Sequence, residues 1–203
     1  MLRKPSEIMI DGKSLEEIIS EQILETESLP FGISRVDLSG LDLSYADLRT
    51  IDLSYAYLKD TNLKGADLSC ADLSDMDLIG VDLSCADLRC ANLEGADLTG
   101  AKLNNTHLNC AKLKFADLRK ADLRKADLSC TDLSDASLRG ADLRGTNLSY
   151  ANLSCVDLRD VDLTTIDLKK VDLTDAYLTD TDYDEAMREL FSEEYDVFTD
   201  EDL

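Results

Sequence analysis

Four cysteines recur at intervals of twenty residues, at Cys70, Cys90, Cys110 and Cys130. If the chain folds with a repeat of twenty, four thiols stack on one face, where they could bind a soft metal ion or take part in redox chemistry. A disulfide between neighbours is disfavoured, because side chains of an in-register parallel ladder point the same way and do not reach the required torsion of about 90°. The pattern favours the other interpretation, duplication of a twenty-residue unit in which a small thiol is tolerated outside.

His107 is the only histidine and stands where most neighbouring units have aspartate. Together with Cys90 and Cys110 it would give three loosely placed ligands, which is weak support for a metal site. A Ser/His/Asp hydrolase would need a serine hydroxyl, this histidine and a carboxylate to converge in a pocket, and a straight filled rod without long loops offers no obvious pocket. A glycine-rich phosphate loop is also absent from the sequence. We therefore expect no enzyme, with no catalytic, metal or cofactor-binding residues and no cofactor.

The composition limits the partners. The chain has 203 residues with 43 acidic and 21 basic side chains, a net charge of −22, and 44% apolar residues, enough for one sizeable core. Residues 1–30 contain no apolar run long enough for a signal peptide or membrane span, so we expect a cytoplasmic protein with reduced thiols and no membrane contact. An acidic surface repels nucleic acid, which excludes direct nucleic-acid binding and favours basic proteins, or proteins that normally grip nucleic acid.

The element that must position these residues is a five-residue repeat. Leucine recurs at every fifth position from Leu38 to Leu178, 29 times, and Ile33 and Tyr183 extend the register, so residues 31–185 form 31 units of the type Ala-Asp-Leu-x-x. A period of five fits neither a helix nor a straight strand. If each unit makes one side and one corner, four units close a square coil of twenty residues with every leucine inside. Stacked coils about 4.8 Å apart would give a rod of roughly 37 Å.

This unbroken array resembles the pentapeptide repeat family, and the resemblance covers residues 31–185. It implies an all-β solenoid, a right-handed quadrilateral parallel β-helix of about eight coils. Similarity in outline to the quinolone-resistance members implies a protein partner, DNA gyrase or topoisomerase IV, bound by mimicry of DNA. Qnr-type members carry loops that interrupt their coils, and this array has none. The alternative is a structural or scaffolding module that binds another protein and is unrelated to topoisomerases.

The two flanks are typical of caps. In residues 1–30, Ser14 and Glu17 form a capping box at the start of an amphipathic helix over residues 14–25, which we expect to cover the first coil. Residues 186–203 contain a second short helix and an acidic tail. The resemblance implies that such a helix joins two rods into a twofold dimer, and a plain cap is compatible with that. The candidate dimer contacts are Met187, Leu190, Phe191, Tyr195 and Phe198.

Charge is uneven along and around the rod. Residues 102–125 carry a net charge of +5 and form a basic belt between two acidic halves, while the rod as a whole carries −12, about half the charge density of duplex DNA. Sorting units by a period of twenty gives one most acidic face, interrupted by Lys112 and Lys114. Its candidate binding residues are Asp52, Asp72, Asp75, Glu94, Asp132, Asp135, Asp172 and Asp175. The alternative is that aspartate before leucine simply stabilises each corner by bonding local backbone amides.

Overall fold

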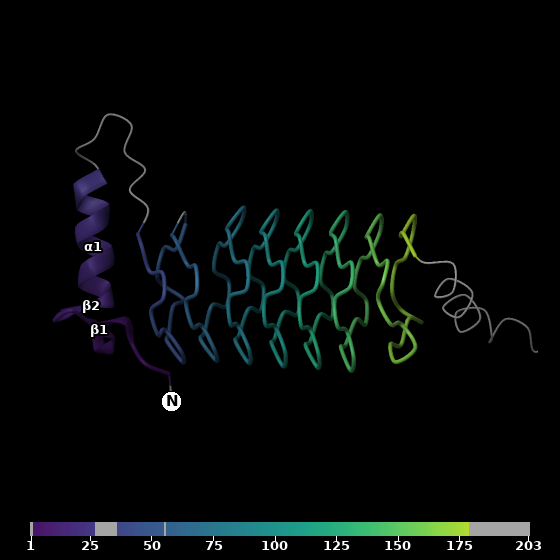
Figure 1. The fold of residues 1–203 in the computed structure, drawn as a ribbon, viewed down its shortest axis with the longest axis horizontal. Coiled ribbons are helices and arrows are strands. Elements are labelled where there is room, and N and C mark those ends of the chain that lie inside the picture. Colours follow the sequence, from purple (N-terminus) through teal and green to yellow (C-terminus); the bar gives the residue numbers. More distant parts are fainter. Residues whose placement is uncertain (1, 27–35, 55, 179–203) are drawn as a thin grey trace, which may run out of the picture.

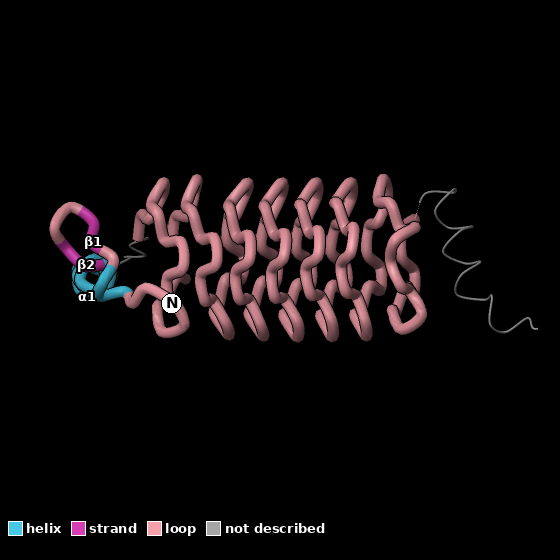
Figure 2. Tube along the Cα trace, turned by 90° about the horizontal axis from the view of Figure 1, so that it is seen from below, coloured by secondary structure: helices cyan, strands magenta, loops and turns pink. Residues whose placement is uncertain are grey.

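The computed structural model describes residues 2–26, 36–54 and 56–178, and within them a rod of stacked coils extends from a small N-terminal helical unit (Figure 1). The rod is held by isolated parallel bridges between residues twenty positions apart, from Asp37 with Tyr57 to Asp157 with Tyr177. Each bridge uses the residue before a leucine. The predicted coil of twenty residues is therefore confirmed, and Figure 2 shows the same stacking from a view turned by 90°.

Backbone hydrogen bonds explain why the rod shows bridges rather than long strands. Leu68 N–H donates to the Asp87 carbonyl at 2.8 Å, and Asp87 N–H donates to the Ala66 carbonyl at 2.9 Å. At the corner that follows, Ala71 N–H donates back to the Leu68 carbonyl at 3.0 Å and closes the turn that leads the chain onto the next side of the coil. Each side of the square is thus only long enough for one paired residue.

The core is a column of leucines. Every leucine of the repeat from Leu38 to Leu168 is buried, and Leu173 and Leu178 are partly buried against them. The small residue two positions before each leucine shares the interior, and it is usually alanine. Four buried threonines replace it and donate their hydroxyls to the carbonyl of a leucine 23 residues earlier, so no polar group is left unsatisfied at these sites. They are Thr61, Thr106, Thr131 and Thr146.

The fifth residue of each unit occupies the left-handed region at the described corners, with three exceptions: Thr50, Thr165 and Lys170. Two of the three are threonine, and β-branched residues disfavour positive φ. The ladder is interrupted near these threonines. The bridges that the repeat would form between residues 52 and 72, 57 and 77, 142 and 162, and 147 and 167 are missing from the described coils.

The N-terminal segment joins the first coil by its backbone. Arg3 forms a parallel bridge with Ala46, and its guanidinium donates to the Ser44 carbonyl at 2.8 Å. A 3₁₀ helix at Pro5–Glu7 and a hairpin of β1 (Met9–Ile10) and β2 (Lys13–Ser14) follow, and they lead into α1 (Leu15–Thr26). None of the helices in the described part of the chain is long and apolar enough to cross a membrane.

The predicted capping box at the start of this helix is confirmed. Ser14 N–H donates to a Glu17 carboxylate oxygen at 2.8 Å, and Glu17 N–H donates to Ser14 Oγ at 3.2 Å. Ile8, Leu15 and Ile19 are buried in the same apolar cluster as the rod leucines. The second helix, predicted in residues 186–203, lies outside the described residues.

Candidate functional site: an acidic face

The four sides of the coil form four faces along the rod. We name them A, B, C and D after the units that contain Leu38, Leu43, Leu48 and Leu53, each continuing at every twentieth residue. Over the described units the faces carry net charges of −2 (A), 0 (B), −1 (C) and −6 (D). Most of the negative charge of the described rod therefore lies on face D, which contains all eight predicted acidic residues.

The aspartate before each leucine stabilises the corner that follows it. On face D, Asp72 accepts a hydrogen bond from Ser74 N–H at 3.1 Å, and Asp172 accepts one from Thr174 N–H at 3.0 Å. The hydroxyl of the same serine or threonine also donates to the carboxylate, and these two bonds lower the pKa of Asp72 and of Asp172. This agrees with the structural interpretation of the repeated aspartate, and it applies to the candidate face as well.

Arginine distinguishes the other three faces from face D. On faces A, B and C, several aspartates are followed two residues later by an arginine that folds back onto the carboxylate, as Arg119 does on Asp117 with both Nε–O distances at 2.8 Å. The guanidinium lowers the pKa of the Asp117 carboxyl. These pairs are Arg49 with Asp47, Arg89 with Asp87, Arg119 with Asp117, Arg124 with Asp122, Arg144 with Asp142 and Arg159 with Asp157.

Face D has no such pair among its described units, because serine, threonine, glutamate or lysine follows each of its leucines. Its one ion pair in the described part of the chain joins Lys114 Nζ to Asp135 at 3.8 Å. The carboxylates of Asp72, Asp132 and Asp172 therefore keep one oxygen available to a partner. Sequence reasoning found the face but missed this cause, although the signal is readable as Asp-Leu-Ser or Asp-Leu-Thr in place of Asp-Leu-Arg.

The structure brings the eight predicted residues onto one surface in two columns and one intermediate position. Seven are exposed and Asp132 is half-buried. The column before the leucines contains Asp52, Asp72, Asp132 and Asp172, the corner column contains Asp75, Asp135 and Asp175, and Glu94 lies between the columns.

A basic and aromatic centre divides the acidic face. Lys112 is bridged to Asn92 on one side and to Asp132 on the other. Lys114 Nζ lies 4.8 Å from the centroid of the Phe115 ring, and Phe115 is 55% exposed. Exposed aromatic residues are frequent anchors of protein interfaces. Face D therefore presents two acidic stretches that flank a cationic, aromatic patch.

The thiols and the histidine are not gathered into a site. Cys70, Cys90, Cys110 and Cys130 are free and exposed, and each occupies a left-handed corner. His107 lies in the bridged column of face C, between Asp87 and Asp127. Within the described ranges, no group of three or more histidine, cysteine, aspartate or glutamate side chains is placed to hold a metal ion.

Comparison with known proteins identifies the repeat. The family model for pentapeptide repeats matches eight copies, over residues 33–69, 51–84, 86–125 and 126–164. HetL from the cyanobacterium Nostoc, described as involved in regulation of heterocyst differentiation, is 34% identical over 71% of this chain and 81% of its own, with a TM-score of 0.47. QnrB1, a plasmid-mediated fluoroquinolone resistance protein, is 27% identical over 76% of this chain and 83% of its own, with a TM-score of 0.49. A search of curated proteins found no match. The chain belongs to the pentapeptide repeat family.

Proposed function

We propose that this protein is a non-enzymatic binding rod that presents face D to a protein whose groove normally holds DNA. The observation that carries the proposal is the concentration of charge on face D, −6 against −2, 0 and −1 on the other faces, with no arginine clamped on its described carboxylates. The family resemblance to quinolone-resistance members makes a type II topoisomerase, DNA gyrase or topoisomerase IV, the first partner to test.

The spacing of the acidic groups supports recognition at separate points rather than along a continuous line. The pairs Asp72/Asp75 and Asp132/Asp135 are three coils apart, about 14 Å at the usual ladder spacing. Duplex DNA carries one charge per about 1.7 Å, so the rod imitates only part of that density. Binding should therefore weaken as ionic strength rises and should compete with DNA.

The experiment is inhibition of DNA supercoiling by purified gyrase across a concentration series of this protein. The test variant carries Asp72→Asn, Asp132→Asn and Asp172→Asn. Asparagine already fills this position on face D, where Asn152 accepts the Ser154 N–H bond at 3.0 Å, so the corners should survive. The matched control carries Asp77→Asn, Asp97→Asn and Asp162→Asn, the same change of charge on faces A and B.

We expect the wild type and the control to inhibit supercoiling and the face D variant to lose most of its effect. Equal inhibition by both variants would exclude face D as the contact. No inhibition at high micromolar protein would remove gyrase from the proposal.

A homodimer through the C-terminus is part of the same proposal and rests on the sequence alone, since Met187, Leu190, Phe191, Tyr195 and Phe198 lie outside the described residues. A variant truncated after Glu185 provides the test. Monomeric mass by light scattering together with lost inhibition would support a dimeric mimic. An unchanged mass would exclude these residues as the dimer contact.

The N-terminal segment is proposed to cap the first coil. Arg3 pairs with the exposed backbone edge of that coil, and Ile8, Leu15 and Ile19 add to the same apolar core. An open end would leave both backbone groups and leucines exposed. Deleting residues 2–26 should therefore lower the unfolding midpoint and promote aggregation, and an unchanged midpoint would contradict the capping role.

A scaffolding role without a topoisomerase is the second candidate, and the exposed Phe115 beside Lys114 favours it. A protein groove that binds the charged DNA backbone does not require an exposed phenyl ring at the centre of the face that occupies it. If Phe115→Ala abolishes binding to a partner that DNA does not displace, the scaffold becomes the working function.

A further inference from the structure

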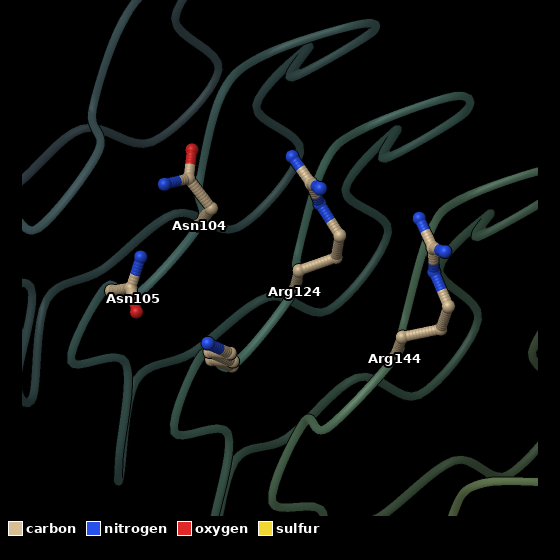
Figure 3. Close-up of a pocket in the computed structure, with 5 residues that line it drawn as sticks. Asn104, Asn105, Arg124 and Arg144 are labelled. Carbon is tan, nitrogen blue, oxygen red and sulfur yellow. The ribbon is translucent and has the colours of Figure 1, made fainter.

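A local basic patch lies across the rod from face D, on face B, whose net charge over the described units is 0. The faces follow one another around the coil in the order A, B, C, D, so face B is opposite face D. At mid-length on face B is an open depression of about 390 Å³, lined by Asn104, Asn105, Arg124, Lys125 and Arg144 (Figure 3). It lies within and beside the basic belt of residues 102–125, and the function proposed for face D does not involve it.

The two arginines of the depression are held in place with one edge free. Arg124 Nε and Nη2 donate to the Asp122 carboxylate at 2.7 and 2.6 Å, and Arg144 Nε donates to Asp142 at 2.8 Å. Arg124 and Arg144 follow the same ladder as Asn104, one coil or about 4.8 Å apart, and Figure 3 shows the two arginine side chains extended in similar directions. A guanidinium that is already fixed loses little conformational freedom when it takes a second acceptor.

The remaining groups add donors and few free acceptors. Asn104 Oδ1 accepts a hydrogen bond from Ser84 Oγ at 2.9 Å, so this acceptor is already in use and the amide N–H₂ group is left as a donor. Lys125 has no carboxylate within ion-pair distance in the described part of the chain, and it stands in the corner column between Asn105 and Gly145. Glycine at the next corner leaves the lysine side chain uncovered, since a Cβ there would lie 3.5 Å from Lys125 Cγ.

The chemistry of this donor set favours a compact, highly charged oxyanion. The lining residues carry three positive charges, of which Arg124 and Arg144 are paired with Asp122 and Asp142 while Lys125 is not paired in the described part of the chain, and no aromatic or aliphatic side chain lines the depression that could hold a base or an acyl chain. Guanidinium groups match the geometry of phosphate oxygens, and lysine contributes a point charge. Three cations attract a phosphoryl dianion more strongly than they attract a carboxylate, which has a single negative charge.

We propose that the face B depression binds a phosphoryl group, carried by a small phosphate compound or by a phosphorylated side chain of a partner protein. The group lies between Arg124, Lys125 and Arg144, with the asparagine amides completing its hydrogen bonds. This site is independent of the function proposed for face D, and it would let one rod bind partners of opposite charge on opposite faces.

The test is an NMR titration of the full-length protein, observing the Nε–H signals of Arg124 and Arg144 and the side-chain amides of Asn104 and Asn105. The probes are inorganic phosphate, a neutral peptide with one phosphoserine, the same peptide with serine, and the same peptide with glutamate. The test variant is Arg124→Gln with Lys125→Gln. The matched control is Lys120→Gln with Arg159→Gln, in which the lysine has the same corner φ of 58° and the arginine clamps Asp157 in the same way.

We expect phosphate or the phosphopeptide to shift these signals, and the test variant to lose about tenfold or more in affinity while the control keeps it. Tighter binding of the phosphopeptide than of inorganic phosphate identifies a phosphorylated partner, and the reverse order identifies a small phosphate compound. Absence of shifts at millimolar phosphate, equal loss in both variants, or equal affinity for the glutamate peptide would overturn the proposal.

Discussion

Replacing Thr165 by glycine should repair an interruption of the ladder and stabilise the rod. Thr165 stands in a corner column in which the corner residue of each of the other described coils has positive φ. A β-branched side chain disfavours that conformation. On either side of it, the bridges between residues 142 and 162 and between 147 and 167 are missing. Glycine adopts positive φ without a steric penalty, so Thr165→Gly lets the corner close as it does at Gly145.

The size of the effect follows from the bonds that a regular bridge contains. One five-residue unit earlier, the bridge between Ser137 and Asp157 has two hydrogen bonds: Leu138 N–H to the Asp157 carbonyl at 2.8 Å and Asp157 N–H to the Ala136 carbonyl at 3.0 Å. Two restored bridges would add four such bonds, worth about 0.5 kcal/mol each at the low end expected near the end of a rod. Glycine costs about 0.5–1 kcal/mol of backbone entropy. The net gain in the free energy of unfolding should be about 1–1.5 kcal/mol.

Urea unfolding followed by circular dichroism measures this gain, and hydrogen exchange locates it. The amides of Leu143 and Leu148 should become protected, because by the pattern of the repeat they would donate to the carbonyls of residues 162 and 167. Thr165→Ala is the control, since it removes β-branching but keeps a Cβ at the corner, and it should give a smaller gain. Lower stability of the glycine variant with unprotected Leu143 and Leu148 would refute this account of the interruption.

Three further outcomes follow from the core, the corners and the carboxylates. Leu108→Ala removes a fully buried side chain at mid-rod and should lower the free energy of unfolding by about 3–5 kcal/mol in urea titrations, whereas a loss below ~1 kcal/mol would mean that the coils collapse onto the cavity. Gly95→Ala should destabilise by about 1–2 kcal/mol in the same assay, because φ is +70° and the new Cβ would lie within van der Waals overlap of Asp75 Oδ1. The folded-state pKa of Asp72, Asp117 and Asp172 lies below the unfolded value of about 3.9, so their stabilisation is present above that pH and is lost as pH falls through the folded values. Thermal melting should therefore show a falling midpoint below about pH 4, and a midpoint that keeps rising there would contradict these hydrogen bonds.

The coil was predictable from the sequence because a single physical requirement recurs without interruption. A leucine at every fifth position can be buried only if the chain turns a corner in every unit, and the bridges between residues twenty apart follow from that. The same arithmetic placed Asp72 and Asp132 on one face and Lys112 between them. The position of a residue within the repeat determines which residues lie next to it in the adjacent coils, so these neighbours could be derived from the sequence.

Two features could not be derived, for different reasons. The pairing of Arg3 with Ala46 joins segments more than forty residues apart, and Arg3 lies outside the repeat, so no local pattern specifies its partner. The clamps such as Arg124 on Asp122 depend on a side-chain rotamer, and the spacing of two residues permits but does not require the arginine to fold back. A count of charges therefore identified face D as the most acidic face but could not show that the arginines of the other faces pair with their own aspartates.

The residue after each leucine and the corner residue that follows it together set how acidic a face is, and the leucine core does not constrain the charge at either position. Aspartate before leucine stabilises the corner on every face, so its presence carries little information about binding: Asp122 on face B and Asp72 on face D accept the same kind of backbone N–H bond. What differs is the next outward side chain, Arg124 in one case and Ser74 in the other. The arginine neutralises its carboxylate and contributes a cation to the face B depression, while the serine leaves a carboxylate oxygen free on face D. One repeat thus builds an acidic face D and a face B that has no net charge but carries a local basic depression, without any change to its core, so surface charge can vary around the rod independently of the leucine column.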